Sequence, residues 1–327
     1  MSRLRLGVPL SLSGKHDRFG KQAGLGLEVW RSFNESVEVI VEDDRSDPEV
    51  LERVLRGLSS RCDILLGPYS TQLMRRAGQV ATELDRLIWN HGGSGDDVET
   101  AHPGHVVSVL TPTSWYAEPF IRQVARGPLW VAEGKGSFGR QVAEGAERCA
   151  EEFGIRVVRI RPGDALPSVQ DDPWSLLCAG SFAEDVEVIK RARADGPRVI
   201  CAVAAGVREF GEAVGDPRGI YGVGQWFPGG GGEAAIGMSE RDFVNAYWDR
   251  AGALPDYPAV QAAATAIIAA HGVARAGSTG RAELWSVATD LETSTLFGAF
   301  KIDPSTGAQV GHRTALIRWE SDGPRPL

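Results

Sequence analysis

The sequence predicts an α/β fold made of two lobes, each with a parallel central sheet. The first observation is a regular alternation of short apolar runs and helical patterns between Leu4 and Trp89. The second is that this alternation starts again near Pro128, after a segment rich in turn residues and prolines at roughly 101–119. The third is the length, because 327 residues suit two lobes of roughly 150 residues better than one core.

The first lobe is expected to follow the order βαβαβαβ, which is typical of a parallel sheet covered on both faces. Asp47 followed by Pro48 indicates a helix start, since an N-cap acid precedes proline at the first helical position. Ser70 or Thr71 is the expected N-cap of the next helix. The expected strands are Leu4–Pro9, Val37–Val41, Asp63–Leu66 and Leu87–Trp89, and the expected helices lie near Gly20–Asn34 and at Pro48–Leu58 and Gln72–Leu84.

The second lobe repeats this plan, and further helices follow it. Its expected strands are Pro128–Ala132, Arg156–Ile160, Ser175–Ala179, Arg198–Ala204 and Gly219–Gln225. Four successive glycines, Gly229–Gly232, predict a flexible connector that marks the return to the first lobe. The remaining expected elements are helices at Ser239–Trp248, at Ala259–Val273 and around Ala282–Leu291, then a hairpin of Phe297–Ile302 with Arg313–Trp319.

Charge and hydropathy argue against two classes of partner. The net charge is -8 and the sequence pI is near 5.4, and no tract is rich in Lys or Arg. The electrostatic footprint of a nucleic-acid or anionic-lipid binder is therefore missing. The longest apolar stretch, 260–270, is far shorter than the roughly 20 residues that a membrane span needs, so we expect no direct membrane insertion.

The chain passes from Met1 almost directly into its first strand, which leaves no room for a signal peptide. We expect a cytoplasmic protein if Met1 is the native start and an extracytoplasmic one if an export segment was trimmed. The four cysteines form no CxxC pair and lie in or beside apolar stretches, so we expect buried free thiols, with an unassigned disulfide as the alternative. They are Cys62, Cys149, Cys178 and Cys201.

Small polar loops follow three strands of the first lobe, at Ser11–Gly14, Gly67–Thr71 and Asn90–Ser94. The carboxyl ends of parallel strands meet at one edge of a sheet, so hydroxyls and helix-start amides gathered there can hold an anion or a polar small molecule. Aromatic residues are also frequent near loops, and we expect about half of them to be core and the rest to line a pocket. They are Phe19, Tyr69, Trp115, Tyr116, Phe138, Phe182 and Trp226.

Gly134–Gly139 matches GxGxxG between a strand and a helix. A dinucleotide-binding fold would also place an acid about 20 residues further on, but the next strand ends with Arg161 and Pro162. An arginine suits a phosphorylated ribose, so an NADP-dependent oxidoreductase is an alternative. A plain glycine-rich turn is the favoured interpretation.

Metal and catalytic motifs are not evident. Adjacent carboxylates at 42–44 would alternate between faces of a strand, so helix capping and a structural role are favoured for them and for Asp47. His102 and His105 have no third ligand at a suitable spacing. No Gly-x-Ser-x-Gly elbow occurs and the histidines have no evident nucleophile, so we expect neither an enzyme nor a cofactor.

The sequence resembles the type I periplasmic binding proteins, in particular the branched-chain amino-acid receptor group. The resemblance runs along nearly the whole chain, and its motifs occur in the family's order. They are Gly7–Gly14 with Phe19 and Gly20, the acids at 42–44 with Asp47 and Pro48, Leu66–Thr71, Ser137–Gly139, Asp256–Pro258, Phe297 and Gly298 with the turn at 303–307, and Trp319.

The resemblance implies two Rossmann-like lobes joined by three hinge crossings, which close on a ligand. The N-terminal lobe would be 1–118 plus 233–311, and the C-terminal lobe 119–232 plus 312–327. The expected function is that of a monomeric solute-binding protein for an ABC permease or a signalling partner. A cytoplasmic ligand-sensing regulator of the amide-sensor type shares the fold and is the alternative. The candidate ligand-binding residues are Phe19, Tyr69, Ser70, Thr71, Gly93, Ser94, Tyr116, Phe138, Phe182, Ala205 and Trp226.

One departure from the family pattern concerns the ligand. In amino-acid receptors of this kind, an acid from the second lobe meets the ammonium group of the ligand. Here the loop in that place is Ala204–Val207, and Glu209 lies further on. Because a buried ammonium without a counter-charge costs several kcal/mol, we do not expect the ligand to be an ordinary amino acid. We expect instead a carboxylate, an amide, an aromatic or aliphatic acid, or another amino-acid-like compound.

Overall fold

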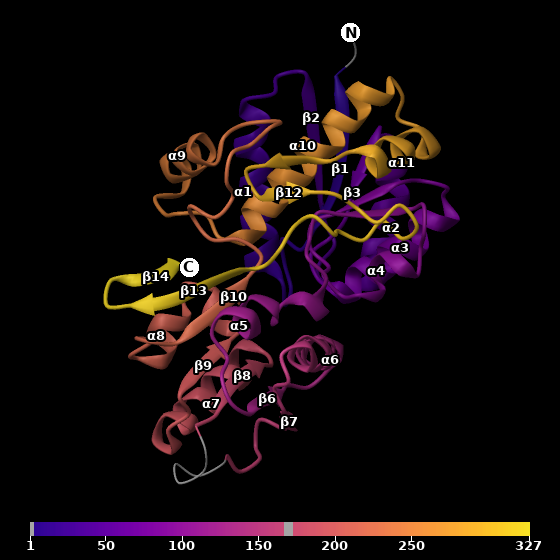
Figure 1. Ribbon diagram of the computed structural model, residues 1–327. Coiled ribbons are helices and arrows are strands. Elements are labelled where there is room, and N and C mark those ends of the chain that lie inside the picture. The colour runs from indigo at the N-terminus through magenta and orange to yellow at the C-terminus, as the bar shows by residue number, and fades with distance from the viewer. Residues whose placement is uncertain (1–2, 167–172) are drawn as a thin grey trace. The chain divides into compact units, whose positions relative to one another are not determined.

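The computed structural model describes residues 3–166 and 173–327, which form two compact units (Figure 1). Unit 1 contains the chain up to Thr111 together with Trp226–His312, and unit 2 contains Pro112–Gln225 and Arg313–Leu327. The chain passes from one unit to the other three times. The crossings follow residues 111, 225 and 312, whereas the lobe bounds that the family resemblance implies would put them after 118, 232 and 311.

Unit 1 contains a five-stranded parallel sheet in the order β2-β1-β3-β4-β5. The first four strands and the helices between them follow the expected alternation. The sequence pattern does not predict β5, which is only three residues long. The strands are β1 (Leu4–Leu10), β2 (Val37–Asp43), β3 (Ile64–Leu66), β4 (Ile88–Asn90) and β5 (Val106–Ser108).

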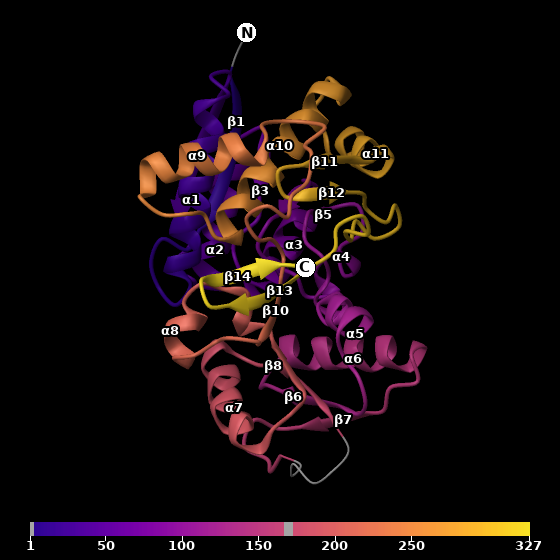
Figure 2. The ribbon, with the colours of Figure 1, turned by 60° about the vertical axis from the view of Figure 1, so that its left-hand side comes forward.

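Helices cover both faces of this sheet, as Figures 1 and 2 show. One face packs against α1 (Asp17–Ser32), α9 (Glu240–Ala251), α10 (Tyr257–Ala276) and α11 (Arg281–Asp290), and the other against α2 (Pro48–Ser59), α3 (Thr71–Glu83) and α4 (Asp97–Thr100). Helices α1 and α10 approach closely at Gly26, where an added Cβ would lie 2.2 Å from the carbonyl oxygen of Ala259. Among the described residues, no helix combines the length and the apolar character that a membrane span requires.

Unit 2 contains a seven-stranded sheet in the order β14-β13-β10-β9-β8-β6-β7. Strands β6 to β10 are parallel, and β13 and β14 extend the sheet in antiparallel pairing. The strands are β6 (Leu129–Glu133), β7 (Val157–Ile160), β8 (Ser175–Ala179), β9 (Val199–Ala202), β10 (Tyr221–Gly224), β13 (Ala315–Glu320) and β14 (Gly323–Pro326). The helical segments are η1 (Thr113–Trp115), α5 (Glu118–Gln123), α6 (Ser137–Glu152), α7 (Phe182–Asp195), η2 (Ala204–Gly206) and α8 (Phe210–Val214).

The expected hairpin of Phe297–Ile302 with Arg313–Trp319 is wrong. Strand β12 (Gly298–Phe300) pairs with β11 (Thr293–Thr295) in unit 1. Strand β13 instead pairs with β10 and β14 in unit 2. The third crossing lies between these strands, and a turn signal does not reveal which sheet edge each strand joins.

The glycine run is also not the flexible crossing that the sequence predicts. The crossing lies before it, after Gln225. Within unit 1 the carboxylate of Glu240 accepts the amides of Gly229 and Gly231, at 2.5 and 3.0 Å. The run is therefore held by the first turn of α9.

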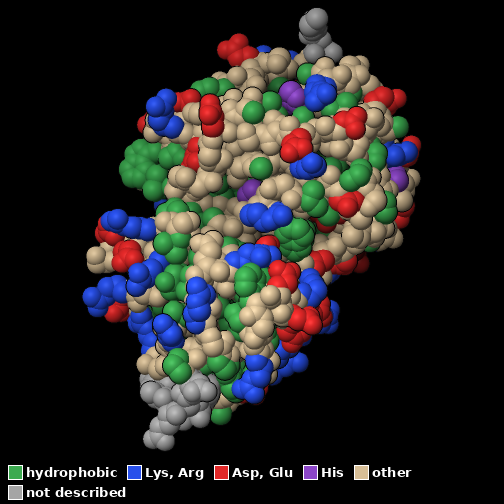
Figure 3. Space-filling view, in the orientation of Figure 1, with side chains coloured by type: hydrophobic (Ala, Val, Ile, Leu, Met, Phe, Trp, Pro, Cys, Tyr) green, Lys and Arg blue, Asp and Glu red, His purple; other side chains and the backbone are tan. Residues whose placement is uncertain are grey.

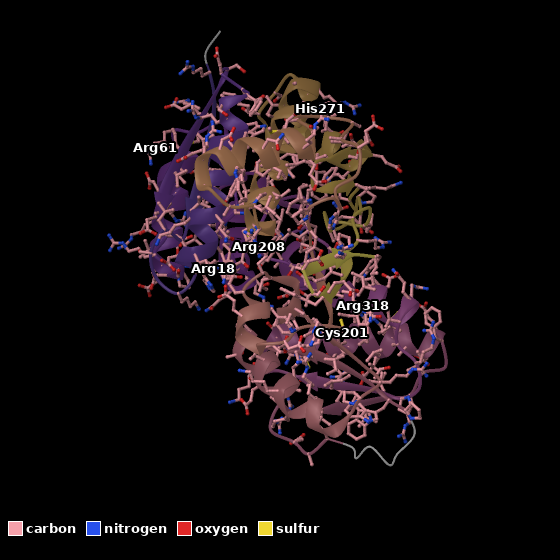
Figure 4. The ribbon with its side chains drawn as sticks, turned by 90° about the vertical axis from the view of Figure 1, so that its left-hand side faces the viewer. Arg18, Arg61, Cys201, Arg208, His271 and Arg318 are labelled. Atoms are coloured by element: carbon pink, nitrogen blue, oxygen red, sulfur yellow. The ribbon has the colours of Figure 1, made fainter. Side chains whose placement is uncertain are left out.

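The expectation of buried free thiols is confirmed for all four cysteines. Burial raises the pKa of Cys178 and of Cys201, so both thiols stay protonated at neutral pH. Cys201, which Figure 4 labels, lies on β9 inside unit 2.

Candidate ligand-binding loops

The loop after β1 is occupied by the protein's own carboxylates. The Ser11 hydroxyl donates to Asp44 Oδ1 at 2.6 Å. The amides of Leu12 and Ser13 donate to Asp43 Oδ1 at 2.9 and 3.2 Å, and the Ser13 hydroxyl donates to Asp43 Oδ2 at 2.7 Å. These donors are engaged, so the loop at 11–14 does not offer the anion cradle that its composition suggests.

The acidic run at the end of β2 has the structural role that the sequence favours. Asp43 and Asp44 hold the neighbouring loop, and Asp47 caps α2 by accepting the amides of Glu49 and Val50 at 2.8 and 3.0 Å. Burial raises the pKa of Asp44, although hydrogen bonds from Ser11 and Ser46 oppose this effect. In the part of the chain that the structure describes, no cluster of three or more His, Cys, Asp or Glu could hold a metal ion.

Asn90, the last residue of β4, organises the loop at 91–94. Its Oδ1 accepts the amides of Gly92 and Gly93, at 3.0 and 2.9 Å. Its Nδ2 donates to the Gly93 carbonyl at 2.7 Å and to Glu99 Oε1 and Ser108 Oγ at 3.0 Å each. Because Asn90 is fully buried, these bonds fix the loop to the end of the sheet.

Two titratable groups lie buried around this loop. Burial raises the pKa of Glu99 to about 7, although hydrogen bonds with Ser108 and Asn90 lower it. Burial lowers the pKa of His91 to about 4, so His91 is neutral at pH 7. The carboxyl group that contacts Asn90 therefore changes its charge near neutral pH.

Ser70 and Thr71 lie at the start of α3, next to the same loop. Ser70 has a φ of 95°, which is unusual for a residue with a side chain, and its amide donates to the Gly92 carbonyl at 2.9 Å. Its hydroxyl oxygen accepts the Leu73 amide at 3.3 Å, and Thr71 Oγ1 accepts the Gly95 amide at 3.1 Å. In both bonds the hydroxyl oxygen is the acceptor, so each hydroxyl hydrogen can be donated to a ligand.

An aromatic group lies beside these hydroxyls in unit 1. The rings of Phe19 and Tyr69 stack with their centroids 4.5 Å apart and an interplanar angle of 12°. The Tyr69 hydroxyl bonds to the Tyr257 hydroxyl at 2.7 Å, and the guanidinium of Arg18, labelled in Figure 4, lies 5.3 Å from the Phe19 ring centroid. Four of the candidates, Phe19, Tyr69, Ser70 and Thr71, thus come together on α1 and the β3–α3 loop. Sequence reasoning missed Tyr257 as their partner, although it noted the Asp256–Pro258 motif.

Gly93 and Ser94 complete the candidates in unit 1. Gly93 is buried, and an added Cβ would lie 2.6 Å from Cβ of Met74, so this position requires glycine for packing. Ser94 is partly exposed on the same loop. Gly93 can therefore offer only its backbone to a ligand, whereas Ser94 also has an accessible side chain.

Backbone conformation and close packing explain two of the glycines at 134–139 without a bound cofactor. Gly136 has a φ of 98°. An added Cβ at Gly139 would lie 2.5 Å from the Ala179 carbonyl oxygen. The Lys135 amide donates to Glu184 Oε1 at 3.4 Å, so this loop amide is already engaged by a carboxylate of the protein.

The arginine that could serve a phosphorylated ribose is also engaged. Arg161 Nη1 lies 3.1 Å from Glu133 Oε1, and Arg159 Nη1 lies 3.2 Å from Glu133 Oε2. Glu133 ends β6 and is only 8% exposed. These contacts, together with the engaged loop amide, oppose the dinucleotide interpretation.

Two of the aromatic candidates in unit 2 meet each other. Tyr116 and Phe138 make an edge-to-face contact with their centroids 5.5 Å apart. The Tyr116 hydroxyl accepts a hydrogen bond from Gln225 Nε2 at 2.9 Å, and both residues are buried. Phe182 is 39% exposed at the start of α7 and is not part of this contact.

Ala205 and Trp226 present almost no surface. Ala205 is fully buried, and its carbonyl oxygen accepts the indole N–H of Trp319 at 2.9 Å. Trp226 is 3% exposed and packs in the core of unit 1, not in the second lobe where the sequence places it. Neither side chain is brought to the surface near the other candidates.

Sequence reasoning missed Asp185 altogether. This residue of α7 is 1% exposed, and its carboxylate accepts the amides of Gly180 and Ala204 at 2.7 and 3.0 Å. Burial raises its pKa to about 7, although the two amides oppose this effect. The capping box of Ser181 and Glu184 could have indicated the start of α7, but no local signal shows that the next acid is buried.

Basic side chains gather on unit 2 around β13, β14 and α8 (Figure 3). Several of them lie beside acids: Arg218 bonds to Asp216 at 2.9 Å, and Arg325 bonds to Asp322 at 2.5 Å. Arg318 lies 3.7 Å from Glu320. These neighbours offset much of the local positive charge.

The comparisons with known proteins agree with this architecture. The sequence matches the family described as periplasmic binding protein over residues 4–324. No curated protein matches the sequence. Three solved structures that resemble the chain illustrate the fold.

A leucine-binding protein from Thermotoga maritima has a TM-score of 0.80 at 16% identity, covering 99% of this chain and 97% of that one. An ABC transporter substrate-binding protein from Desulfitobacterium hafniense in complex with Leu has a TM-score of 0.81 at 14% identity, covering 100% of both chains. A solute-binding protein from Rhodopseudomonas palustris in complex with benzoate has a TM-score of 0.76 at 18% identity, covering 100% of this chain and 96% of that one. Because the family match spans nearly the whole sequence, the chain belongs to the periplasmic binding protein family and has its type I fold.

Proposed function

We propose that this solute-binding protein serves an ABC-type importer and that its ligand is a small organic acid without an ammonium group. Family membership supports the general solute-binding role. The similar proteins include ABC transporter components, some solved with Leu and others with benzoate or 3,4-dihydroxybenzoic acid. The choice between these ligand classes rests on which charged and polar groups the loops of each unit, taken separately, can offer.

The proposal rests on the partners of three acids of unit 2, Glu133 at the end of β6 and Glu184 and Asp185 in the first turn of α7. Glu133 pairs with two arginines, Glu184 accepts the amides of Ser181 and Lys135, and Asp185 accepts two loop amides. The two arginines neutralise Glu133, whereas backbone amides leave the charges of Glu184 and Asp185 in place. Asp185 is buried, and the loop at 204–207, where the family pattern places the acid that meets an ammonium group, contains no acid. The ammonium group of an amino acid would lose its hydration there without a counter-charge, at a cost of several kcal/mol.

Unit 1, considered by itself, offers donors for a carboxylate. The hydroxyl hydrogens of Ser70 and Thr71 can be donated, and the first amides of α3 have no acceptor within the helix. A carboxylate matches such donors, and the helix dipole favours its negative charge. The stacked Phe19 and Tyr69 rings supply an apolar surface for the rest of the ligand.

The test uses two pairs of compounds that differ only in the α-amino group. We expect 4-methylpentanoate and 3-phenylpropanoate to raise the melting temperature, whereas leucine and phenylalanine do not. A ligand present at a hundred times its dissociation constant stabilises the protein by about 2.7 kcal/mol, which a thermal-shift assay detects. A shift with leucine and none with 4-methylpentanoate would contradict the proposal.

A pair of variants tests the place of binding. Ser70→Ala combined with Thr71→Val removes both donors and should abolish the shift with 4-methylpentanoate. The control is Ser13→Ala, because the Ser13 hydroxyl is directed to Asp43 and should not contribute to binding. Equal shifts in both variants would place the ligand elsewhere.

The importer role and lobe closure need separate measurements. Permease genes beside the coding gene and an extracytoplasmic location in cell fractionation would support import, whereas a regulatory operon and a cytoplasmic location would support the sensor alternative. Closure on the ligand stays a prediction that the resemblance implies. Small-angle scattering should show a smaller radius of gyration with 4-methylpentanoate, and an unchanged radius would contradict closure.

A further inference from the structure

We propose that Asp185 is a positioning residue that holds the two candidate binding loops of unit 2 in one arrangement. These are the loop after β8, which leads to Phe182, and the loop after β9, which contains Ala205. The inference rests on the proposed function, because it concerns loops that matter only if unit 2 contacts the ligand.

The geometry shows how one side chain sets the relation between two loops. Asp185 Oδ1 accepts the Gly180 amide at 2.7 Å, and Oδ2 accepts the Ala204 amide at 3.0 Å. The two oxygens belong to one planar group, so neither loop can shift without breaking a hydrogen bond. With the side chain 1% exposed, water cannot easily replace either bond.

The β9 loop is also held from its other sides. The Val203 amide donates to the Cys178 carbonyl at 3.1 Å, and the Trp319 indole N–H donates to the Ala205 carbonyl at 2.9 Å. Strand β10 also lies close to this loop, since an added Cβ at Gly222 of β10 would lie 2.6 Å from the Ala205 carbonyl oxygen. Asp185 therefore completes a preorganised loop, and preorganisation lowers the entropy cost of binding.

The position requires a carboxylate rather than an amide. A carboxylate accepts with both oxygens, whereas an asparagine would turn its NH₂ group towards one of the backbone amides. Protonation would weaken one of the two bonds in a similar way, because the protonated oxygen is a poorer acceptor. Since burial raises the pKa of Asp185 to about 7, this change falls near neutral pH.

Within the part of the chain that the structure describes, few charged groups lie near Asp185. Glu184 on the same helix raises its pKa further, and Cys178 of β8 and Cys201 of β9 are its titratable neighbours from the sheet. Both thiols stay neutral at pH 7 because burial raises their pKa values. Of the helical segments packed on α7, η2 has no titratable side chain and the Glu212 side chain of α8 is exposed to solvent.

The first experiment needs no ligand. We expect the backbone amide resonances of Gly180 and Ala204 in the wild-type protein to shift together between pH 5 and pH 9, with a common midpoint near the pKa of Asp185. The shift should disappear in Asp185→Asn and persist in Glu187→Gln, which removes an exposed carboxylate of the same helix. Amides that do not titrate in the wild type, or that still titrate in Asp185→Asn, would overturn the proposal.

The second experiment measures the effect on binding. Asp185→Asn should bind 4-methylpentanoate about tenfold more weakly than Glu187→Gln at pH 8, as expected for one lost charge-assisted hydrogen bond. Equal affinities would refute a positioning role. If the wild type does not bind 4-methylpentanoate, the proposed function fails, and the amide titration still decides whether Asp185 holds the two loops.

Discussion

Replacing Glu99 by glutamine should change how stability depends on pH. The pKa of this buried carboxyl is raised from the ordinary 4.5 to about 7, so the folded protein binds the proton more tightly than the unfolded chain. The stability that this proton contributes is fully present below pH 4.5 and is lost as the pH rises through 7. Glutamine has no such proton, so Glu99→Gln removes this part of the pH dependence.

The magnitude follows from the two pKa values. Between pH 5 and pH 8, the wild-type free energy of unfolding should fall by about 2.5 kcal/mol through Glu99 alone. The difference between Glu99→Gln and the wild type should therefore move in favour of the variant by the same amount over this range. This change with pH is expected whatever free energy of unfolding the variant gains or loses at pH 5 through altered hydrogen bonds with Asn90 and Ser108.

Urea unfolding at pH 5, 6, 7 and 8 measures this difference. The control is Glu35→Gln, which removes an exposed carboxylate from a turn of the same unit. A constant difference between Glu99→Gln and the wild type at all four pH values would refute the reasoning, because Glu99 would then keep one charge state throughout.

Three further predictions concern unit 1, each checked by equilibrium unfolding. Ser70→Ala should lower the free energy of unfolding by about 1 kcal/mol through loss of the N-cap, whereas Ser70→Gly should cost less because glycine tolerates the φ of 95°. Equal losses would show that the backbone strain is unimportant. Gly26→Ala should destabilise by about 1–3 kcal/mol because the new Cβ meets the backbone of α10, while Gly57→Ala, with open space around it, should stabilise by about 0.5–1 kcal/mol. Two changes of the same sign would contradict this. Tyr257→Phe should cost about 1 kcal/mol by removing the hydrogen bond to Tyr69, and an unchanged stability would mean that water replaces this bond.

Much of unit 1 could be predicted because its signals are local. The Asp47 and Pro48 start of α2 is one example, since Asp47 caps the helix as its position before a proline predicts. The hairpin expectation failed because strand pairing depends on which sheet edge is free, and residues nearby in sequence do not reveal this.

The candidate site could be predicted only in part, because some of its features are local in the sequence and others are not. The rule that loops meet at the carboxyl edge brought Ser70, Thr71 and the loop at 91–94 together. Composition did not show that the donors of the β1 loop are already engaged by Asp43 and Asp44. Hydrogen-bond partners of this kind lie tens of residues apart, so only the folded chain shows which polar groups remain for a ligand.

The sequence by itself determined the fold class, the alternation of strands and helices, and the absence of an acid at 204–207, because periodicity, capping residues and residue identity are local properties. Only the tertiary structure decided the roles of the buried polar residues. Asn90, Glu99 and Asp185 are short or medium polar side chains that look like ordinary surface residues in the sequence. Burial gives them their roles, since removal from water shifts the pKa values of both acids towards 7 and makes each hydrogen bond to a loop hard to replace.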